Sequence, residues 1–386
     1  MKKKLLFLNG HLNPGGVEKA LVDVLKHLDY SKYEVDLVLF EELGAYLDQI
    51  PTDVNVRLVD LHNTYGSVAS SLLRCVRERD WLCFRLRVLF LMAKYFGGEV
   101  LKLARGMLFG KKQYDAAIGF RIGLCTDLVA YAVNSPQKIT WWHHGEYNLS
   151  KDESEAYRET CRRMSHVIAV SEGCARFLKD YLPEISDKVS VIPNMVPVKE
   201  IQEKAELFQP YDCGTALKIV SVGRLSPEKH MENCVYAAKY LLKQGIEDFR
   251  WFIVGDGEER DRIEGLVEQH GLNGYVAFTG SQSNPYPYIK NADLFVHPSY
   301  VESQGLVVLE AMALGIPCVV TKSLGTCEFL EDEVNCVLTE KTPDSLAEMV
   351  EKMISSKGLY RHIQVNTICP NQFLPSVIME QIESLI

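Results

Sequence analysis

The feature that most constrains the fold is an alternation of short apolar runs with segments of helical periodicity, repeated along the whole chain. Short apolar runs bounded by turn residues are typical of strands buried on both faces. Helical segments between such strands indicate a parallel sheet that is covered by helices on both sides. The pattern therefore predicts an α/β protein of the doubly wound type.

The alternation occurs twice. In the first half we expect strands at 4–8, 34–40, 55–60, 116–120, 138–142, 166–170 and 189–192, with helices such as 17–28 and 124–133. In the second half we expect strands at 217–222, 251–255, 276–279, 294–298 and 318–321. These patterns predict two Rossmann-like domains at 1–195 and 216–370, a linker at 196–215, and a C-terminal helix at 371–386 that packs back on the first domain. Because ligands of such sheets bind at the carboxyl ends of strands, two such domains facing each other would form a cleft between their loops.

The composition excludes several other classes. The 386 residues are 47% apolar and 24% charged, which is ordinary for a globular protein and excludes a disordered, collagen-like or coiled-coil chain. The formal charge of −9 is unevenly distributed, because residues 1–200 carry 27 basic and 25 acidic side chains, against 15 and 26 in the remainder. With so acidic a second half and no stacking module, nucleic acid is not predicted as a partner.

One segment, residues 72–112, is strongly basic although the chain as a whole is acidic. Ten basic residues and three acidic ones lie between Arg74 and Lys112, and aromatic side chains such as Trp81 and Phe96 are interleaved with them. Such a composition suits an amphipathic helix at an anionic membrane surface, with Arg85, Arg87 and Lys94 as the candidate membrane-facing cations. An ordinary helix pair that covers the first sheet is the alternative.

The cysteines and the lengths of the apolar runs indicate the cellular compartment of the protein. The eleven cysteines never form C-x-x-C, so we interpret them as reduced core thiols of a cytoplasmic protein and predict no metal site. The first apolar run ends at Asn9-Gly10, too early for a signal peptide, and the run at 88–93 is too short to span a membrane. We expect a cytoplasmic protein, attached at most peripherally to the inner face of the cell membrane.

Three strand ends carry candidate binding residues. Gly15 and Gly16 follow the first predicted strand and open a helix, where free backbone N–H groups hold anions, although a tight turn alone explains the glycines equally well. Arg224 and Lys229 follow the strand at 217–222, and two such cations suit a diphosphate, although a solvated loop is the alternative.

The third strand end, HPSYVESQGLVVLEAMALGIP, is the most informative segment. A helix is expected from Gly305 to Gly315, so the backbone N–H groups of Gly305, Leu306 and Val307 would be unpaired. Glu302 and Glu310 flank that helix start and suit the hydroxyls of a sugar and of a ribose. Alternatively, Glu302 caps the helix and Glu310 lies on its wet face. The helix is apolar nearly all round, however, so Glu310 would be buried and would need a partner.

In this combination the chain resembles retaining glycosyltransferases of the GT-B fold, family 4, also called glycosyl transferases group 1. The second half contains the recurring elements in order: Gly223-Arg224 with Lys229, Val254-Gly255-Asp256-Gly257, Phe278-Thr279-Gly280, and Glu302 with Glu310. The first half resembles the acceptor domain, with the GGVEK turn and the TWWHHGEY strand end. Gln304 departs from the frequent aromatic residue, and Asn335-Cys336 from the usual Asn-Gly, which leaves the donor sugar open.

The resemblance implies a role for each matching residue. Arg224 and Lys229 would bind the diphosphate, and Glu310 the ribose. Glu302 and the backbone of Gln304–Val307 would hold the donor sugar and the β-phosphate, and Gly16 would approach the phosphate from the facing domain. One histidine of the pair His143-His144 would lie beside the reactive sugar. We favour His144, because strand alternation points the two side chains in opposite directions and Gly145 follows.

The resemblance also implies the reaction. It predicts transfer of a sugar with retention from a nucleotide-sugar, with UDP as the first expectation, to a sugar or lipid-linked glycan acceptor. The product would be a surface polysaccharide, such as a capsule, or a glycolipid of the cell envelope. No cofactor or metal is expected, since the chain contains no D-x-D motif. The rival hypotheses are a catalytically silent subunit that binds a partner transferase or glycan, and a nucleotide-sugar epimerase on the same fold.

Overall fold

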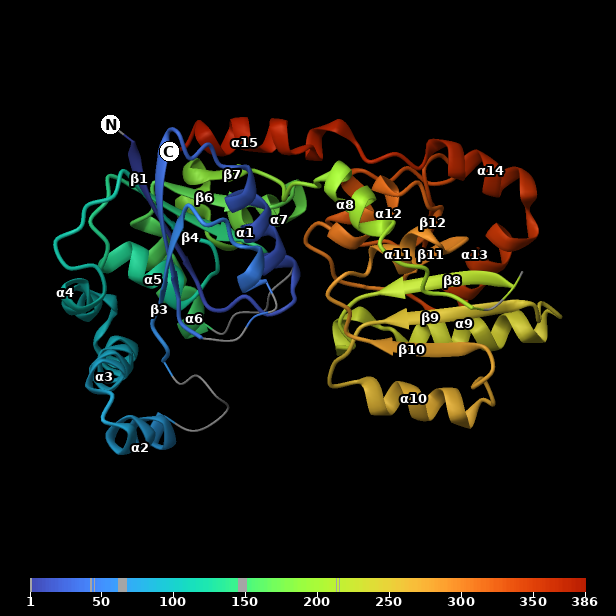
Figure 1. The fold of residues 1–386 in the computed structure, drawn as a ribbon, viewed down its shortest axis with the longest axis horizontal. Helices are drawn as coiled ribbons and strands as arrows, with labels where there is room; N and C mark the ends of the chain where they lie inside the picture. The colour runs from blue at the N-terminus through green and yellow to red at the C-terminus, as the bar shows by residue number, and fades with distance from the viewer. Residues whose placement is uncertain are drawn as a thin grey trace. The chain divides into compact units, whose positions relative to one another are not determined.

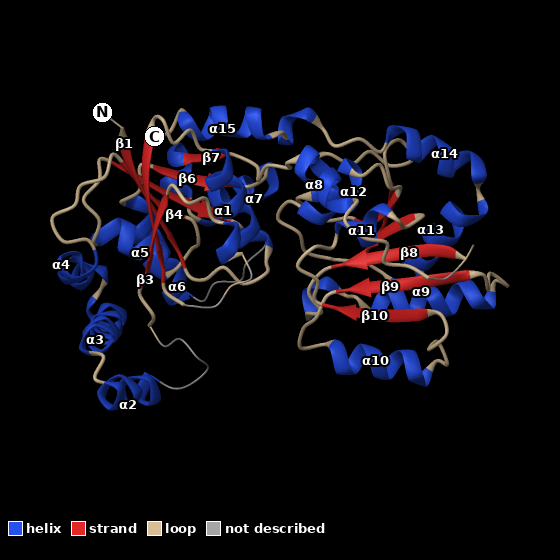
Figure 2. Ribbon diagram, in the orientation of Figure 1, coloured by secondary structure: helices blue, strands red, loops and turns tan. Residues whose placement is uncertain are grey.

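The protein divides into two compact units. The computed structural model describes residues 2–41, 44, 46–61, 68–144, 151–212, 214 and 216–386, excluding the side chains of 68 and 151–153; Gly145 therefore lies outside the described residues. The first unit comprises Met1–Met195 with Ser376–Ile386, and the second comprises Val196–Pro375. Figure 1 follows the chain through both units, and Figure 2 shows helices beside the strands of each sheet.

The first unit is built on a parallel sheet with the strand order β3-β2-β1-β4-β5-β6-β7 among the described residues. Its strands are β1 (Lys3–Asn9), β2 (Tyr33–Leu39), β3 (Val54–Leu58), β4 (Ala116–Gly119), β5 (Gln137–Trp142), β6 (His166–Ala169) and β7 (Val189–Val191). Its helices are α1 (Gly16–His27), α2 (Val68–Glu78), α3 (Trp81–Phe96), α4 (Ala104–Leu108), α5 (Leu124–Tyr131), α6 (Lys151–Arg162), α7 (Glu172–Tyr181) and α15 (Pro375–Glu383), with the 3₁₀ turns η1 (Leu47–Gln49), η2 (Gly98–Leu103) and η3 (Pro183–Lys188).

The second unit repeats this architecture with the parallel strand order β10-β9-β8-β11-β12-β13. Its strands are β8 (Leu217–Val222), β9 (Phe249–Val254), β10 (Val276–Gly280), β11 (Leu294–His297), β12 (Cys318–Thr321) and β13 (Val337–Thr339). Its helices are α8 (Val198–Ala205), α9 (Glu232–Lys243), α10 (Arg260–Gln269), α11 (Tyr286–Lys290), α12 (Leu306–Ala313), α13 (Pro343–Ser355) and α14 (Lys357–Asn366), with the 3₁₀ turns η4 (Pro227–Lys229), η5 (Thr326–Glu328) and η6 (Asn371–Phe373).

Alternation along the central strands produces two apolar layers in the second unit. Ile219 of β8 faces the cluster that holds α9 and α13, whereas its neighbour Val220 faces the cluster that holds α8, α11 and α12. Phe295 of β11 joins the second of these clusters, and Val296 the first. Burial of both faces explains why apolar residues occupy consecutive positions at the centres of these strands, as in Ile219-Val220 and Phe295-Val296. The predicted doubly wound α/β class is confirmed.

The ends of the second unit differ from the prediction in two places. The stretch predicted as a linker, 196–215, contains α8, whose Ile201 and Ala205 are buried in the second unit's core. Its apolar residues are few, so the sequence pattern alone did not predict a helix there. The short edge strand β13 was also not predicted.

The C-terminal helix α15 belongs to the first unit. Its Ile378, Met379 and Ile382 are buried in the hydrophobic core of that unit. Two polar contacts join the same segment to the start of the sheet: Lys3 donates to the carbonyl of Ile386, and Lys32 pairs with Glu383. Figure 1 shows this last, red part of the chain running along the first unit.

The basic segment forms α2, α3, η2 and α4, and Figure 1 shows α2 and α3 extending away from the sheet of the first unit. The two helices pack on each other through buried residues that include Cys75, Cys83 and Leu86. None of the described helices is both long and apolar enough to cross a membrane.

Candidate functional site

In the second unit, two side chains from the ends of two neighbouring strands meet at one carboxylate oxygen of a third residue. Nζ of Lys229, in η4 beyond β8, lies 2.6 Å from Oε1 of Glu302, and Nε2 of His297, at the end of β11, lies 2.8 Å from the same oxygen. Strands β8 and β11 pair in parallel, so their carboxyl ends lie at the same edge of the sheet. Glu302 therefore links the two loops at that edge.

The electrostatics of Glu302 follow from these contacts. Burial opposes ionisation of the carboxyl group, but the charge of Lys229 and the hydrogen bond from His297 outweigh it and hold the pKa of Glu302 well below its ordinary value. The carboxylate is thus charged at neutral pH. Its contact with Lys229 was not predicted from the sequence, which assigned both residues to substrate. His297 was not predicted as a site residue, although it lies in the informative HPSYVE segment.

Arg224 lies in the loop after β8 and is exposed. It forms no ion pair with any residue that the structure describes, in contrast to Lys229. A glycine contact fixes the course of this loop: a Cβ on Gly255, which has φ +149°, would lie 1.9 Å from the carbonyl oxygen of Gly223. The N–H of Leu225 also donates to the carbonyl of Asp256. The Val254–Gly257 motif therefore supports the loop that holds Arg224.

Helix α12 begins beside this loop cluster, at Gly305. Gly305 is its N-cap residue, with φ +78°, and no side chain caps the helix. The first internal hydrogen bonds run from the N–H groups of Val308 and Leu309 to the carbonyl of Gly305, so the N–H groups of Leu306 and Val307 precede the helical ladder. Glu302 does not cap this helix, which removes that alternative. Gln304, just before the N-cap, is buried.

Glu310 is buried within α12, with 6% of its surface exposed. The hydroxyl of Tyr286, in α11, donates to Oε1 of Glu310 at 3.2 Å. This burial excludes the alternative that Glu310 lies on a wet helix face, and Tyr286 is a partner that the sequence analysis did not identify. Its only signal in the sequence was an aromatic-rich segment, Tyr286–Tyr288, before β11.

The predicted residues of the first unit lie at the carboxyl ends of its strands. Gly15 is the extended N-cap of α1, and Gly16 is the first helical residue, directly after β1 and its loop. His143 is 8% exposed and packs against Phe120, with ring centroids 5.0 Å apart. Its burial lowers the pKa of His143 to about 3, so the ring stays neutral.

His144 is less buried than His143 and lies edge-on to Trp142. Burial, followed by the charge of Arg121, lowers the pKa of His144 from its ordinary value. A neutral imidazole at a strand end can accept or donate a hydrogen bond. The structure thus places His143 in the core and leaves His144, after the carboxyl end of β5, partly exposed.

The three candidate membrane cations differ in their environments. Arg85 and Lys94 are exposed on α3. Arg87 is half-buried, and its guanidinium donates to the carbonyl of Leu61 through Nε and Nη2. Arg87 is thus engaged by the first unit's own backbone, because its position on α3 faces the preceding loop.

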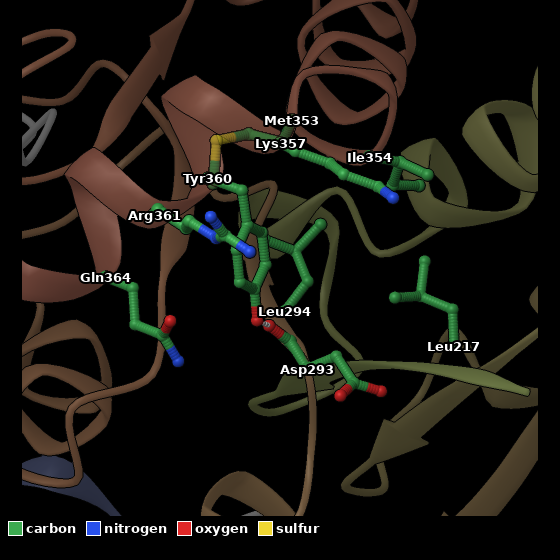
Figure 3. A pocket seen from close by; sticks show the side chains of 9 residues that line it. All are labelled: Leu217, Asp293, Leu294, Met353, Ile354, Lys357, Tyr360, Arg361 and Gln364. Carbon is green, nitrogen blue, oxygen red and sulfur yellow. Dashed lines mark hydrogen bonds between the residues drawn. The ribbon is translucent and has the colours of Figure 1, made fainter. Parts of the chain in front are cut away.

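A separate cavity of about 340 Å³ lies at the opposite edge of the second sheet, where β8 and β11 begin. Its wall includes the hydroxyl of Tyr360, which donates to the carbonyl of Asp293 (Figure 3). Lys357 and Arg361 also line it. None of the predicted site residues lines this cavity. Among the described residues, no cluster of three or more His, Cys, Asp or Glu side chains is arranged to hold a metal ion.

The comparisons with known proteins agree with this geometry. Residues 203–368 match the family model of glycosyl transferases group 1. The matched region lies within the second unit and is similar to group 1 glycosyltransferase domains. It contains Arg224, Lys229, Glu302 and Glu310, so the family resemblance seen in the sequence is confirmed for these motifs.

Relatives and solved structures extend the comparison to the rest of the chain. An uncharacterized glycosyltransferase of Methanocaldococcus jannaschii is 32% identical over 54% of this chain and 54% of its own length. The lipopolysaccharide core biosynthesis glycosyltransferase LpsE of Rhizobium meliloti is 32% identical over 41% and 44%. The chain thus spans about half the length of these curated relatives. The crystal structure of Anabaena HepE in complex with UDP and glucose covers 99% of this chain and 98% of its own, at 21% identity and a TM-score of 0.74. The chain therefore has the GT-B glycosyltransferase fold.

Proposed function

We propose that the chain is a retaining, metal-independent glycosyltransferase that moves a sugar from a nucleotide-sugar to a sugar or lipid-linked glycan acceptor. The observation that carries this proposal is the convergence of Lys229 and His297 on Glu302, beside the exposed Arg224 and the start of α12. A UDP-sugar is the first donor to test, because the solved structure of HepE holds UDP. Relatives named for lipopolysaccharide core biosynthesis support an acceptor in surface polysaccharide or glycolipid synthesis.

The proposed reaction breaks the bond between the anomeric carbon and the phosphate oxygen and forms a bond to the acceptor oxygen on the same face of the sugar. The acceptor oxygen attacks the anomeric carbon directly, so no enzymic nucleophile is needed, and its hydroxyl proton passes to the departing phosphate. Arg224, Lys229 and the α12 start would stabilise the negative charge on the leaving diphosphate. Because these groups supply the positive charge, we expect activity to persist in EDTA.

The remaining residues would position the donor. Glu310 would accept hydrogen bonds from the ribose hydroxyls, and Glu302 from the donor sugar. Ionised Glu302 has acceptor capacity beyond Oε1, which Lys229 and His297 already occupy. In the first unit, His144 would contact the transferred sugar through its neutral ring. Gln304 precedes the α12 start and would help to hold the β-phosphate.

A test of this function begins with thermal shifts of the full chain in UDP-, GDP- and ADP-sugars, because a bound donor stabilises the fold. Release of nucleoside diphosphate is then measured with and without a membrane extract, and the anomeric configuration of the product is read by NMR. We expect Lys229→Ala and Glu310→Ala to lower turnover at least a hundredfold. Lys357→Ala, at the opposite edge of the same unit, is the matched control. A donor-induced shift without any release would favour the catalytically silent subunit, and full activity in both variants would refute the site.

We also propose that α2 and α3 attach the protein peripherally to an anionic membrane surface, at the cytoplasmic face. Apolar side chains on these helices are unusually exposed: Phe96 by 74%, Tyr95 by 72% and Trp81 by 55%. Arg85 and Lys94 are exposed on the same helix. Aromatic side chains beside cations suit the boundary between anionic headgroups and acyl chains, where a lipid-linked acceptor would be presented.

Flotation with vesicles tests this attachment. We expect binding to vesicles of equal parts phosphatidylglycerol and phosphatidylcholine, and little binding to phosphatidylcholine alone. Arg85→Glu with Lys94→Glu should weaken the binding at least tenfold, since each basic residue near the surface contributes about 1 kcal/mol. The matched control reverses two exposed cations of the second unit, Lys357→Glu with Arg361→Glu. Equal binding by both double variants would refute the proposal.

A further inference from the structure

The switch point of the first sheet lies between β1 and β4. From β1 the chain proceeds through α1 to β2 on one side, whereas β4 leads through α5 to β5 on the other. Loops that leave a parallel sheet in opposite directions open a crevice outside the carboxyl ends of the two strands, and ligands of such sheets bind there. The residues that follow β1 and β4 are therefore candidates for a binding site within the first unit.

A polar cluster occupies this position. Nη1 of Arg121, two residues beyond β4, lies 2.9 Å from Nε2 of His11 and 3.1 Å from Oε1 of Glu18. His11 follows β1, and Glu18 lies in the first turn of α1. Gly10 lies beside the guanidinium, since a Cβ at that residue would be in ordinary van der Waals contact with Nη1, at 4.0 Å. Two residues of the segment that follows β1 thus hold an arginine of the segment that follows β4.

Burial differs sharply within the cluster. The side chain of Glu18 is 5% exposed, whereas that of Arg121 is 41% exposed. A carboxylate so buried requires a cation, which Arg121 supplies. The contacts of the Arg121 guanidinium with described residues are all made by Nη1, so its Nε and Nη2 donors have no partner among those residues.

The backbone beside the guanidinium is also held. The hydroxyl of Thr126, a residue that is 1% exposed, donates to the carbonyl of Arg121. Arg121 is close enough to His144 for its charge to contribute to the lowered pKa of that histidine, after burial. The buried carboxylate fixes the position of the arginine, and two of its donor nitrogens remain. Such a guanidinium is preorganised to bind a planar or tetrahedral oxyanion.

We propose that Arg121, held by Glu18 and His11, binds an oxyanion carried by the acceptor, either a phosphate ester or a sugar carboxylate. This inference rests on the proposed glycosyltransferase function and names the acceptor's chemical class. The donor's own diphosphate is assigned to the second unit, where Arg224 and Lys229 already provide two cations. An ion pair with a purely structural role does not require a guanidinium that is 41% exposed and whose Nε and Nη2 have no partner among the described residues.

Binding measurements on the full chain test the proposal. The chain is first saturated with UDP, and methyl phosphate, glucuronate and glucose are then titrated in separate calorimetric or NMR experiments. We expect methyl phosphate or glucuronate to bind at least tenfold more tightly than glucose. Binding of methyl phosphate alone would assign a phosphate ester, and binding of glucuronate alone a carboxylate. Equal affinity for all three probes would overturn the proposal.

Variants separate recognition from stability. Arg121→Lys should retain part of the anion binding, and Arg121→Gln should lose at least tenfold. Because Arg121→Gln leaves Glu18 buried without its cation, the double variant Glu18→Gln with Arg121→Gln removes both charges and should fold while failing to bind the anions. Arg361→Gln, an exposed arginine of the second unit, is the matched control and should change nothing. Unaltered anion affinity in the folded double variant would overturn the proposal.

Donor binding distinguishes this failure from failure of the proposed function. If wild type binds no nucleotide and releases none from any nucleotide-sugar, the function itself fails. If UDP binds normally to wild type and to Arg121→Gln while the anion affinities of the two are equal, only the present inference fails. A tenfold loss of UDP affinity in Arg121→Gln would reassign the arginine to the donor and would likewise overturn the acceptor assignment.

Discussion

The ammonium group of Lys229 and the carboxylate of Glu302 lie 2.6 Å apart, although 73 residues separate them in the chain. The pair connects η4, after β8, to the loop after β11. The side chain of Lys229 is 22% exposed and that of Glu302 is 12% exposed. In this largely buried environment, each side chain is the main counter-charge of the other.

Removing one member of the pair should cost more stability than removing both. Lys229→Met leaves a buried carboxylate with only His297 beside it, and we expect a loss of about 2 kcal/mol in the free energy of unfolding. Lys229→Met with Glu302→Gln should recover most of that loss without recovering transferase activity. Urea unfolding of the single and double variants measures the coupling. Additive losses would contradict a direct interaction.

The hydroxyl of Tyr286 should support donor binding through Glu310. Tyr286→Phe removes the donor at 3.2 Å from Oε1 of Glu310, and we expect about 1 kcal/mol of destabilisation with a severalfold weaker affinity for UDP. Tyr288→Phe makes the same chemical change on the same helix α11 and should leave UDP affinity unchanged. Calorimetry with UDP compares the two, and equal affinities would argue against the role of Tyr286.

The backbone of Gly305 should be essential for the start of α12. Gly305→Ala places a Cβ 2.5 Å from Cγ2 of Thr326 and forces an alanine to φ +78°. Gly315→Ala, after the other end of α12, has φ +70° and meets no atom within 4 Å, so it isolates the backbone cost of about 1–2 kcal/mol. Both variants should be destabilised, with only Gly305→Ala losing UDP affinity at least tenfold. A matching loss of UDP affinity in Gly315→Ala would contradict this.

The stability of the protein should fall between about pH 4 and pH 6 because of Asp127. Burial raises the pKa of Asp127 to about 6, against which the hydrogen bond from Thr160 acts only in part. The folded state therefore binds a proton on Asp127 more tightly than the unfolded state does. The stability that this proton contributes to the folded state is present at low pH and is lost as the pH rises through 6.

Asp127→Asn should abolish that pH dependence. We expect the variant to be more stable than wild type by about 2 kcal/mol at pH 7.5 and equal to it near pH 4, once partial exposure is allowed for. Thermal or urea unfolding across this range measures the difference. A constant difference between the two proteins at every pH would show that titration of Asp127 is not the cause.

Several elements could be predicted from the sequence because their signals are local. The strands β8 and β12 have the predicted bounds, since each contains adjacent apolar residues and is followed by a polar or turn residue. The start of α12 at Gly305 was predicted from a glycine that follows a strand and precedes an apolar helix. The burial of Glu310 followed from the apolar residues around it.

Other features depend on contacts that no local pattern contains. The sequence placed Lys229 and Glu302 on separate motifs, and only the parallel pairing of β8 with β11 brings them to one edge. Tyr286 and His297 were not predicted as partners, because an aromatic or a histidine near a strand is usually core. Helix α8 was predicted as part of a linker, because the apolar face that buries it is supplied by distant residues.

The sequence by itself determined the class of the protein: a repeated strand-helix alternation, ordered glycines and charged residues at strand ends, and a basic segment at 72–112. The tertiary structure decided which of those charges meet. Arg121 and Glu18 are 103 residues apart and lie 3.1 Å from each other, because β1 and β4 are neighbours in the sheet although they are distant in the chain. Ionic and hydrogen-bonding partners depend on distances in space, which a sequence period of two or 3.6 residues does not record.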